Sequence, residues 1–252
     1  MPQSKTRHTI IRERYDAVLL DLDGVITDTA SVHAACWKQM FDEYLQKRAA
    51  QKGEAFRPFE IATDYRLYVD GKPRFDGVRD FLTSRGIRLP EGGPDDPPQA
   101  ETVGGLGNRK NDLVNRIIED KGVEPYEGSV KLLRQLRDHG FKVAVVTSSQ
   151  NCTAVLKAAK LDAFFEARVD GDVMHEQHLA GKPAPDTYLA AAKLLSVDPA
   201  RSIVIEDAIV GVEAGQRGKF GLVIGVARKG NAEELRQHGA QVVVNDLSEL
   251  VD

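Results

Sequence analysis

The chain has 252 residues, of which 29% are charged and 42% hydrophobic, a composition typical of a globular protein of one or two domains. Its 34 basic and 38 acidic residues give a net charge of −4, which argues against a nucleic-acid binder or a binder of anionic membranes. No apolar run approaches the roughly 20 residues of a transmembrane helix, and residues 1–14 lack the apolar stretch of a secretory signal. Two cysteines, Cys36 and Cys152, are too few for a disulfide scaffold or a zinc site built on cysteines, so we expect two buried thiols in a cytoplasmic protein. Together with the charge and the absence of long apolar runs, this predicts no membrane or nucleic-acid partner.

The first half of the chain is mostly helical. An apolar strand is predicted over 17–22, and amphipathic helices are predicted over 31–51, 75–85 and 109–121, with no convincing strand between them. Residues 90–107 hold four prolines, five glycines and four acids. A loop of this length is either a variable surface excursion or a mobile or functional segment.

The second half alternates strands with helices. Strands are predicted over 142–147, 167–170, 202–205, 222–226 and 242–244, and helices over 129–139, 153–160, 186–195, 209–217 and 232–238. Asp186 is expected to be an N-cap, and Gly211 and Gly215 are expected to allow close helix packing. This alternation implies a parallel sheet with helices on both faces. We therefore predict an α/β core domain made of 1–29 and 123–252, with a helical domain, 30–122, inserted after the first strand.

Polar side chains follow the predicted strands where the strands end. The first strand runs into Asp21-Leu22-Asp23-Gly24, the second into Thr147-Ser148-Ser149 and a later one into Glu206-Asp207, while a loop carries Gly181-Lys182-Pro183. Ligands of parallel α/β sheets bind beyond the carboxyl ends of the strands. We expect these four clusters to meet at one edge of the sheet.

Three carboxylates at this edge, those of Asp21, Glu206 and Asp207, favour either protonation or a bound divalent cation. Oxygen ligands suit Mg²⁺ better than zinc. Such a cation, together with Lys182, would let an anionic phosphate approach a carboxylate.

Phosphoryl transfer is the chemistry that this combination suits. The Thr147 hydroxyl and the backbone N–H groups after it can hold phosphoryl oxygens. Asp21 could attack phosphorus to form an aspartyl phosphate, and Asp23 could protonate the leaving oxygen and later deprotonate an incoming one.

Four motifs in this order, Asp-Leu-Asp-Gly-Val from residue 21, Thr147-Ser148, Lys182-Pro183 and Glu206-Asp207, resemble the haloacid dehalogenase superfamily. The stretch 21–30 with His33 and Trp37, together with 109–112 and 182–186, resembles its beta-phosphoglucomutase subfamily. The resemblance implies a Rossmann-like core with an inserted helical cap.

The resemblance also implies roles for individual residues. Asp21 matches the nucleophile and Asp23 the general acid/base. The Mg²⁺ site matches Asp21, the Asp23 carbonyl, Glu206 and Asp207, and the holders of the transferring phosphate match Thr147, Ser148 and Lys182. Positions near the sugar and the acid/base match Thr29, His33 and Lys110, and those near a second phosphate match Ser149, Asn151 and Arg74.

The implied activity is a Mg²⁺-dependent mutase that interconverts beta-glucose 1-phosphate and glucose 6-phosphate through glucose 1,6-bisphosphate. A sugar-phosphate phosphatase on the same scaffold is the alternative, because Gln150 stands where these mutases often have lysine. A non-enzymatic scaffold would be expected to have lost a motif residue. We expect a monomer whose partner is a small phosphosugar.

Overall fold

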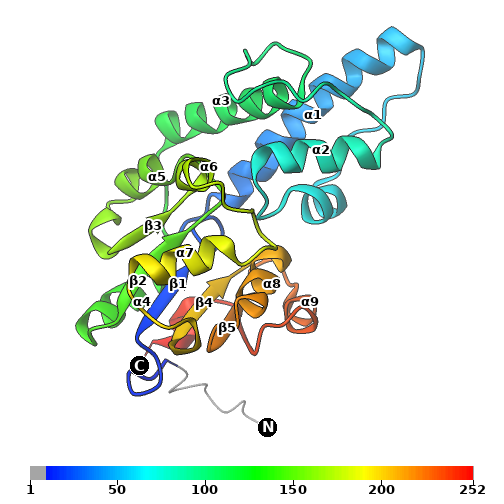
Figure 1. The fold of residues 1–252 in the computed structure, drawn as a ribbon. Coiled ribbons are helices and arrows are strands. Elements are labelled where there is room, and N and C mark those ends of the chain that lie inside the picture. Colours follow the sequence, from blue (N-terminus) through cyan, green and yellow to red (C-terminus); the bar gives the residue numbers. More distant parts are fainter. Residues whose placement is uncertain (1–9, 252) are drawn as a thin grey trace. The chain divides into compact units, whose positions relative to one another are not determined.

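The computed structural model describes residues 10–251, and its chain divides into two units. The core unit comprises Met1–Asp28 and Val123–Asp252, and the helical unit comprises Thr29–Gly122 (Figure 1). Thr29 is thus grouped with the helical residues. The prediction that residues 1–14 are not a secretory signal falls mostly on residues 1–9, which lie outside the described part of the chain. Among the described residues, no helix is both long and apolar enough to cross a membrane.

The core unit is built on a six-stranded parallel sheet in the order β3-β2-β1-β4-β5-β6. Its strands are β1 (Ala17–Leu20), β2 (Lys142–Val146), β3 (Ala167–Val169), β4 (Ser202–Glu206), β5 (Leu222–Val226) and β6 (Val242–Val244). The chain builds outward from β1 on one side, then crosses back and builds outward from β4. This is the doubly wound Rossmann-like order, and its switch point lies at the neighbouring strands β1 and β4.

Helices connect the strands and cover both faces of the sheet. They are α4 (Glu127–Asp138), α5 (Cys152–Ala158), α6 (Gly171–Glu176), α7 (Asp186–Leu194), α8 (Ile209–Arg217) and α9 (Ala232–Gln237), with short 3₁₀ turns η2 (Asp162–Phe164), η3 (Pro199–Arg201) and η4 (Leu247–Leu250). The Asp186 prediction is wrong in detail, because Pro185 is the N-cap and Asp186 starts the helix. Its carboxylate accepts a hydrogen bond from the Ala180 N–H at 3.2 Å instead.

Alternate strand residues explain why both faces must be covered. Leu19 and Val204 pack in one cluster with Tyr188 of α7 and Val212 of α8. The intervening residues Val18, Leu20, Ile203 and Ile205 are also fully buried. Such two-sided burial is typical of a parallel sheet between two helical layers.

The helical unit packs around aromatic side chains. Its elements are α1 (Ala30–Lys52), the π-helix η1 (Ile61–Val69), α2 (Arg74–Ser84) and α3 (Val103–Lys121). The Phe41 ring on α1 stacks on Trp37 and Phe59, each at 5.3 Å between centroids, and contacts Phe81 of α2 at 4.2 Å. These rings form the centre of a separate hydrophobic core.

Side chains hold the proline- and glycine-rich loop that precedes α3. The Asn108 amide donates to the carbonyls of Pro94 at 2.8 Å and Asp96 at 2.7 Å. The Arg109 guanidinium donates to the Pro98 carbonyl at 2.8 Å. Because α3 begins at Val103, the irregular segment is shorter than the sequence predicted.

The chain leaves and re-enters the core unit through one short ladder. Thr27 pairs antiparallel with Pro125, the Asp28 N–H donates to the Glu124 carbonyl at 3.0 Å, and the Tyr126 N–H donates to Ile26 at 3.0 Å. The Tyr126 hydroxyl also donates to the Asp28 carboxylate at 2.8 Å. Residues on both sides of the crossing are therefore fixed to each other within the core unit.

Candidate active site

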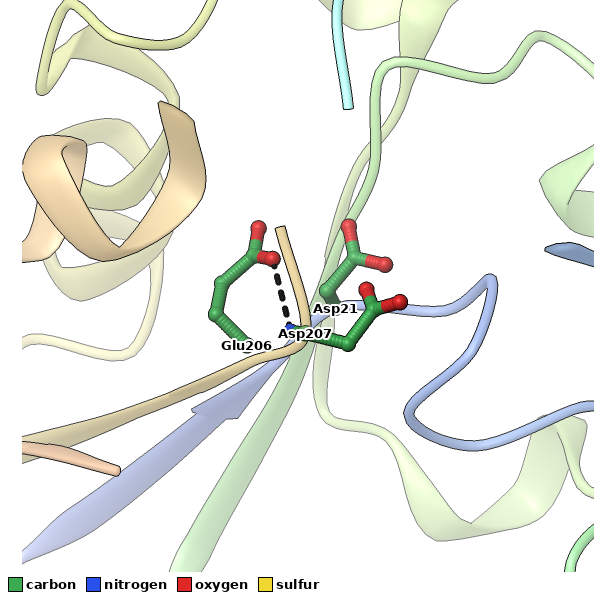
Figure 2. A group of neighbouring side chains, drawn as sticks. All are labelled: Asp21, Glu206 and Asp207. Atoms are coloured by element: carbon green, nitrogen blue, oxygen red, sulfur yellow. Dashed lines mark hydrogen bonds between the residues drawn. The ribbon is translucent and has the colours of Figure 1, made fainter. Parts of the chain in front are cut away.

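The strand register brings the first carboxylates together. Leu20 of β1 pairs with Ile205 of β4, so Asp21 and Glu206 follow at the same level of neighbouring strands. Figure 2 shows the carboxylates of Asp21, Glu206 and Asp207 gathered where the strands end. One oxygen from each of the three lies within 4.8 Å of the others. The site is thus at the switch point of the sheet, where ligands of this fold bind.

Lys182 forms ion pairs with two of these carboxylates. Its Nζ atom lies 2.6 Å from Asp21 Oδ1, 2.5 Å from Glu206 Oε1 and 3.2 Å from the Val146 carbonyl. Burial alone would lower the pKa of this lysine, but the two carboxylates outweigh burial and raise the Lys182 pKa above its ordinary value. The ammonium therefore stays charged at neutral pH.

Glu206 is fixed by four donors, although its side chain is only 1% exposed. Besides the lysine, the Tyr188 hydroxyl donates to Oε1 at 3.0 Å, and the backbone N–H groups of Asp207 and Ala208 donate to Oε2 at 3.0 and 3.1 Å. Burial first, and the Glu206 charge second, raise the pKa of Tyr188 well above its usual value. Tyr188 therefore remains a hydrogen-bond donor.

Asp21 has a different electrostatic environment. Burial raises the pKa of its carboxyl group well above the ordinary value, the Lys182 charge opposes this, and the Glu206 charge adds to it. A divalent cation beside the carboxylate would lower this pKa, because positive charge favours the ionised form. The three carboxylates offer only oxygen atoms as ligands, which is the type of ligand that a divalent cation such as Mg²⁺ prefers, so the site fits a divalent metal.

Asp207 lies against a tight turn. Gly24 has a φ of +92°, and a Cβ atom there would lie 2.8 Å from Asp207 Cγ. Only glycine combines this backbone conformation with so close an approach. The Lys229 ammonium lies 2.9 Å from Asp207 Oδ2.

The predicted phosphate-holding residues form consecutive turns after β2. The Thr147 hydroxyl accepts from the Ser149 N–H at 3.1 Å, and the Ser149 hydroxyl accepts from the Asn151 N–H at 3.1 Å. Thr147 and Asn151 are buried, while Ser148 and Ser149 are half-buried. Asp23, in the turn after β1, is also half-buried.

The helical unit contains the other predicted residues. His33 Nδ1 lies 2.8 Å from the buried Lys110 Nζ, which is 5.0 Å from the centre of the Trp37 ring. Thr29 is buried at the start of α1. Arg74 donates to Asn108 Oδ1 at 2.8 Å and stacks on Phe75. The structure thus pairs His33 with Lys110, and it places Arg74 in a cluster with Asn108.

Sequence reasoning missed three residues of the site. Lys229 and Arg228 follow β5, so the strand-end argument could have found them had it been applied to that strand. Arg228 donates to the Gly24 carbonyl at 3.0 Å and to Asp246 Oδ2 at 2.6 Å. Tyr188 lies inside a helix, where its sequence context indicates only core packing.

A family model described as haloacid dehalogenase-like hydrolase matches residues 15–219. The chain belongs to this family. Among haloacid dehalogenase-like relatives, a beta-phosphoglucomutase of Mycobacterium bovis is 52% identical over 99% of this chain and 97% of its own length. A beta-phosphoglucomutase of Bacillus subtilis is 30% identical, with 93% of this chain and 91% of that protein covered.

A solved structure of beta-phosphoglucomutase from Clostridium difficile has the same fold. It superimposes with a TM-score of 0.74 at 24% identity, covering 94% of this chain and 93% of that chain. The predicted Rossmann-like core is confirmed by this likeness and by the strand order. The resemblance to the haloacid dehalogenase superfamily and its beta-phosphoglucomutase subfamily is likewise confirmed by the relatives.

Proposed function

We propose that this protein is a Mg²⁺-dependent beta-phosphoglucomutase, which interconverts beta-glucose 1-phosphate and glucose 6-phosphate through glucose 1,6-bisphosphate. The observation that carries the proposal is the 52% identity to proteins of that name over nearly the whole chain. The buried cluster of Asp21, Lys182, Glu206 and Asp207 supports it, because this charge arrangement suits phosphoryl transfer.

In the first step, an Asp21 carboxylate oxygen attacks the phosphorus at C1 of glucose 1,6-bisphosphate and forms an aspartyl phosphate, while the bond from phosphorus to the sugar oxygen breaks and glucose 6-phosphate leaves. Asp23 gives its proton to that leaving oxygen. In the second step, the 6-hydroxyl of beta-glucose 1-phosphate attacks the aspartyl phosphate, gives its proton to Asp23 and becomes glucose 1,6-bisphosphate. The bisphosphate formed in one half-reaction is consumed in the other, so Asp21 and Asp23 return to their starting states.

We propose that Mg²⁺ is held by Asp21, the Asp23 carbonyl, Glu206 and Asp207. When bound, it would offset the charge of the phosphoryl group and that of the carboxylates. Lys182 keeps its own charge at the same edge because two buried carboxylates hold it there.

The remaining predicted residues are assigned to substrate binding. Within the core unit, we propose that Thr147, Ser148 and Lys182 hold the transferring phosphate, and that Ser149 and Asn151 contact the second one. Within the helical unit, which we propose is the cap, Thr29, His33 and Lys110 would contact the sugar side, and Arg74 would grip the second phosphate. A guanidinium suits this last role because it can donate to two phosphate oxygens at once.

The test is an assay with beta-glucose 1-phosphate, Mg²⁺ and a trace of glucose 1,6-bisphosphate, in which glucose 6-phosphate and free phosphate are followed separately. A mutase forms glucose 6-phosphate, whereas release of only glucose and phosphate would reject it. EDTA should stop turnover and Mg²⁺ should restore it. Asp21→Asn should fold and lose at least about a thousandfold in rate, as expected for removal of a nucleophile.

A sugar-phosphate phosphatase is the second candidate, and the exposed Gln150 is the observation that favours it. An amide there offers the second phosphate no positive charge. Arg74→Ala separates the two activities: in a mutase it should raise the ratio of phosphate release to isomerisation. The same variant should barely change hydrolysis of acetyl phosphate, which has no second phosphate.

A further inference from the structure

Lys229 follows β5, a strand whose carboxyl end contributes no residue to the proposed mechanism. In the sheet, Gly225 of β5 pairs with Glu206 of β4, so the carboxyl ends of these strands adjoin. The turn after β5 is held by its backbone: the Gly230 N–H donates to Ala227 at 3.1 Å, and the Ala227 N–H donates to Val244 at 2.8 Å. Lys229 therefore extends toward the carboxylates from a fixed point.

The contact of Lys229 with Asp207 is unequal in exposure. Nζ lies 2.9 Å from Oδ2, yet the lysine side chain is 37% exposed and the aspartate side chain only 3%. Lys182, by comparison, is 1% exposed and bonded to two carboxylates. A half-exposed lysine on a flexible four-carbon stem can withdraw to water at little cost, whereas the fixed Lys182 cannot.

Charge explains why Lys229 would have to withdraw. A divalent cation bound by Asp207 brings positive charge to the carboxylate that Lys229 already neutralises. Two cations in contact with the same carboxylate repel each other strongly where water is scarce. The ammonium and a metal ion therefore compete for Asp207.

We propose that Lys229 is a displaceable counter-ion of the metal site. It neutralises Asp207 in the metal-free protein, and it moves to solvent when a divalent cation binds. Lys229 thereby weakens the affinity for Mg²⁺ and stabilises the metal-free protein. The inference rests on the metal site of the proposed function, but not on the identity of the sugar or on the mutase reaction.

Calorimetric titration of the metal-free protein with MgCl₂ tests this competition directly. Lys229→Met should bind Mg²⁺ about tenfold more tightly than the wild type, the effect of removing one ion pair that metal binding must break. Lys229→Arg keeps the charge and should bind no more tightly than the wild type. Lys193→Met removes a positive charge from an exposed position on α7 and should leave Kd within about twofold.

Thermal unfolding gives a second readout that a merely structural lysine would not produce. In EDTA, Lys229→Met should melt at a lower temperature than the wild type, because Asp207 has lost its counter-charge. In saturating Mg²⁺ this difference should vanish, because the metal supplies the charge. An equal loss in both conditions would overturn the inference.

The outcomes separate the inference from the proposed function. Unchanged or weaker Mg²⁺ binding by Lys229→Met, with normal binding by the wild type, overturns the counter-ion role and leaves the metal site standing. If the wild type does not bind Mg²⁺, or if Asp207→Asn binds it as tightly as the wild type, the metal site is wrong and the inference falls with it. Normal Mg²⁺ affinity together with loss of phosphate binding in Lys229→Met would instead make Lys229 a phosphate contact.

Discussion

Two glycines on α8, Gly211 and Gly215, permit a matched test of the site geometry. A Cβ atom at 211 would overlap the Glu206 carboxylate and lie 2.6 Å from its Cγ, whereas a Cβ at 215 would lie 3.0 Å from the nearest atom, a methyl carbon of Val223. Carbon atoms prefer a separation of about 3.5–4.0 Å. Gly211→Ala must therefore move the Glu206 carboxylate, whose atoms lie still closer than Cγ, by about 1.5 Å, while Gly215→Ala requires its neighbours to move by only a few tenths of an ångström.

The expected magnitudes follow from the bonds of Glu206. A shift of this size disrupts its contacts with Lys182 at 2.5 Å and Tyr188 at 3.0 Å. Hydrogen bonds to charged groups contribute about 1.5–3 kcal/mol each, and the gain in helix propensity from glycine to alanine is at most about 1 kcal/mol. Gly211→Ala should thus lower the free energy of unfolding by about 2–5 kcal/mol, and Gly215→Ala should change it by less than about 1 kcal/mol.

Urea unfolding followed by circular dichroism measures the free energies, and acetyl phosphate hydrolysis in Mg²⁺ measures the site. We expect Gly211→Ala to lose at least about a hundredfold in rate, since a misplaced carboxylate disturbs both lysine and metal. Glu206→Asp should partly restore the stability of Gly211→Ala, because the shorter side chain withdraws from the added methyl group. Equal losses for the 211 and 215 variants would refute the reasoning.

Three further changes address other parts of the core unit. Asp23→Asn should slow transfer from sugar phosphates more than from acetyl phosphate, whose leaving group needs little protonation; parallel losses with both donors would make Asp23 structural. Tyr188→Phe removes the hydroxyl that donates to Glu206 and should cost about 1.5 kcal/mol in urea unfolding, the low end for a charged acceptor that keeps its other donors. The guanidinium groups of Arg201 and Arg12 hold the pKa of the Asp16 carboxyl below its ordinary value. These ion pairs therefore stabilise the fold at pH values above the ordinary aspartate pKa, and the stabilisation is lost as the pH falls below about 4. Unfolding midpoints at pH 7 and pH 3 should therefore differ less for Asp16→Asn than for the wild type, and an unchanged difference would contradict this assignment.

The sheet could be predicted from the sequence because its strands are short, apolar and bounded by polar turns. The predicted limits of β5, β6 and α8 agree with the structure. The start of α3 was missed, because Gly104, Gly105 and Gly107 favour a loop; burial of Val103 and Leu106 in the helical core overrides that propensity. The π-helix η1 and the short helix α6 were also missed.

The site could be predicted where residues directly follow strands, as Asp21 and Glu206 do. Lys182 was found through its motif, and the sequence could not place its ammonium between two particular carboxylates. Tyr188 was not found because its hydroxyl reaches Glu206 only after α7 packs on the sheet. Both cysteines are free and buried, as expected. A cytoplasmic location and a monomeric state stay predictions, which fractionation and size-exclusion chromatography would test.

The ladder that joins Thr27 to Pro125 has a consequence for how such proteins diversify. Because Asp28 and Glu124 are hydrogen-bonded to each other, the intervening chain begins and ends at the same place on the core. A gene segment encoding another insert could replace Thr29–Gly122 without disturbing the register of β1, β2 and β4. With the roles proposed above, the phosphoryl-transfer chemistry of the core unit and the choice of substrate by the helical unit can be inherited separately. A core closed by a short linker between 28 and 123 should retain the sheet that carries Asp21 and Glu206.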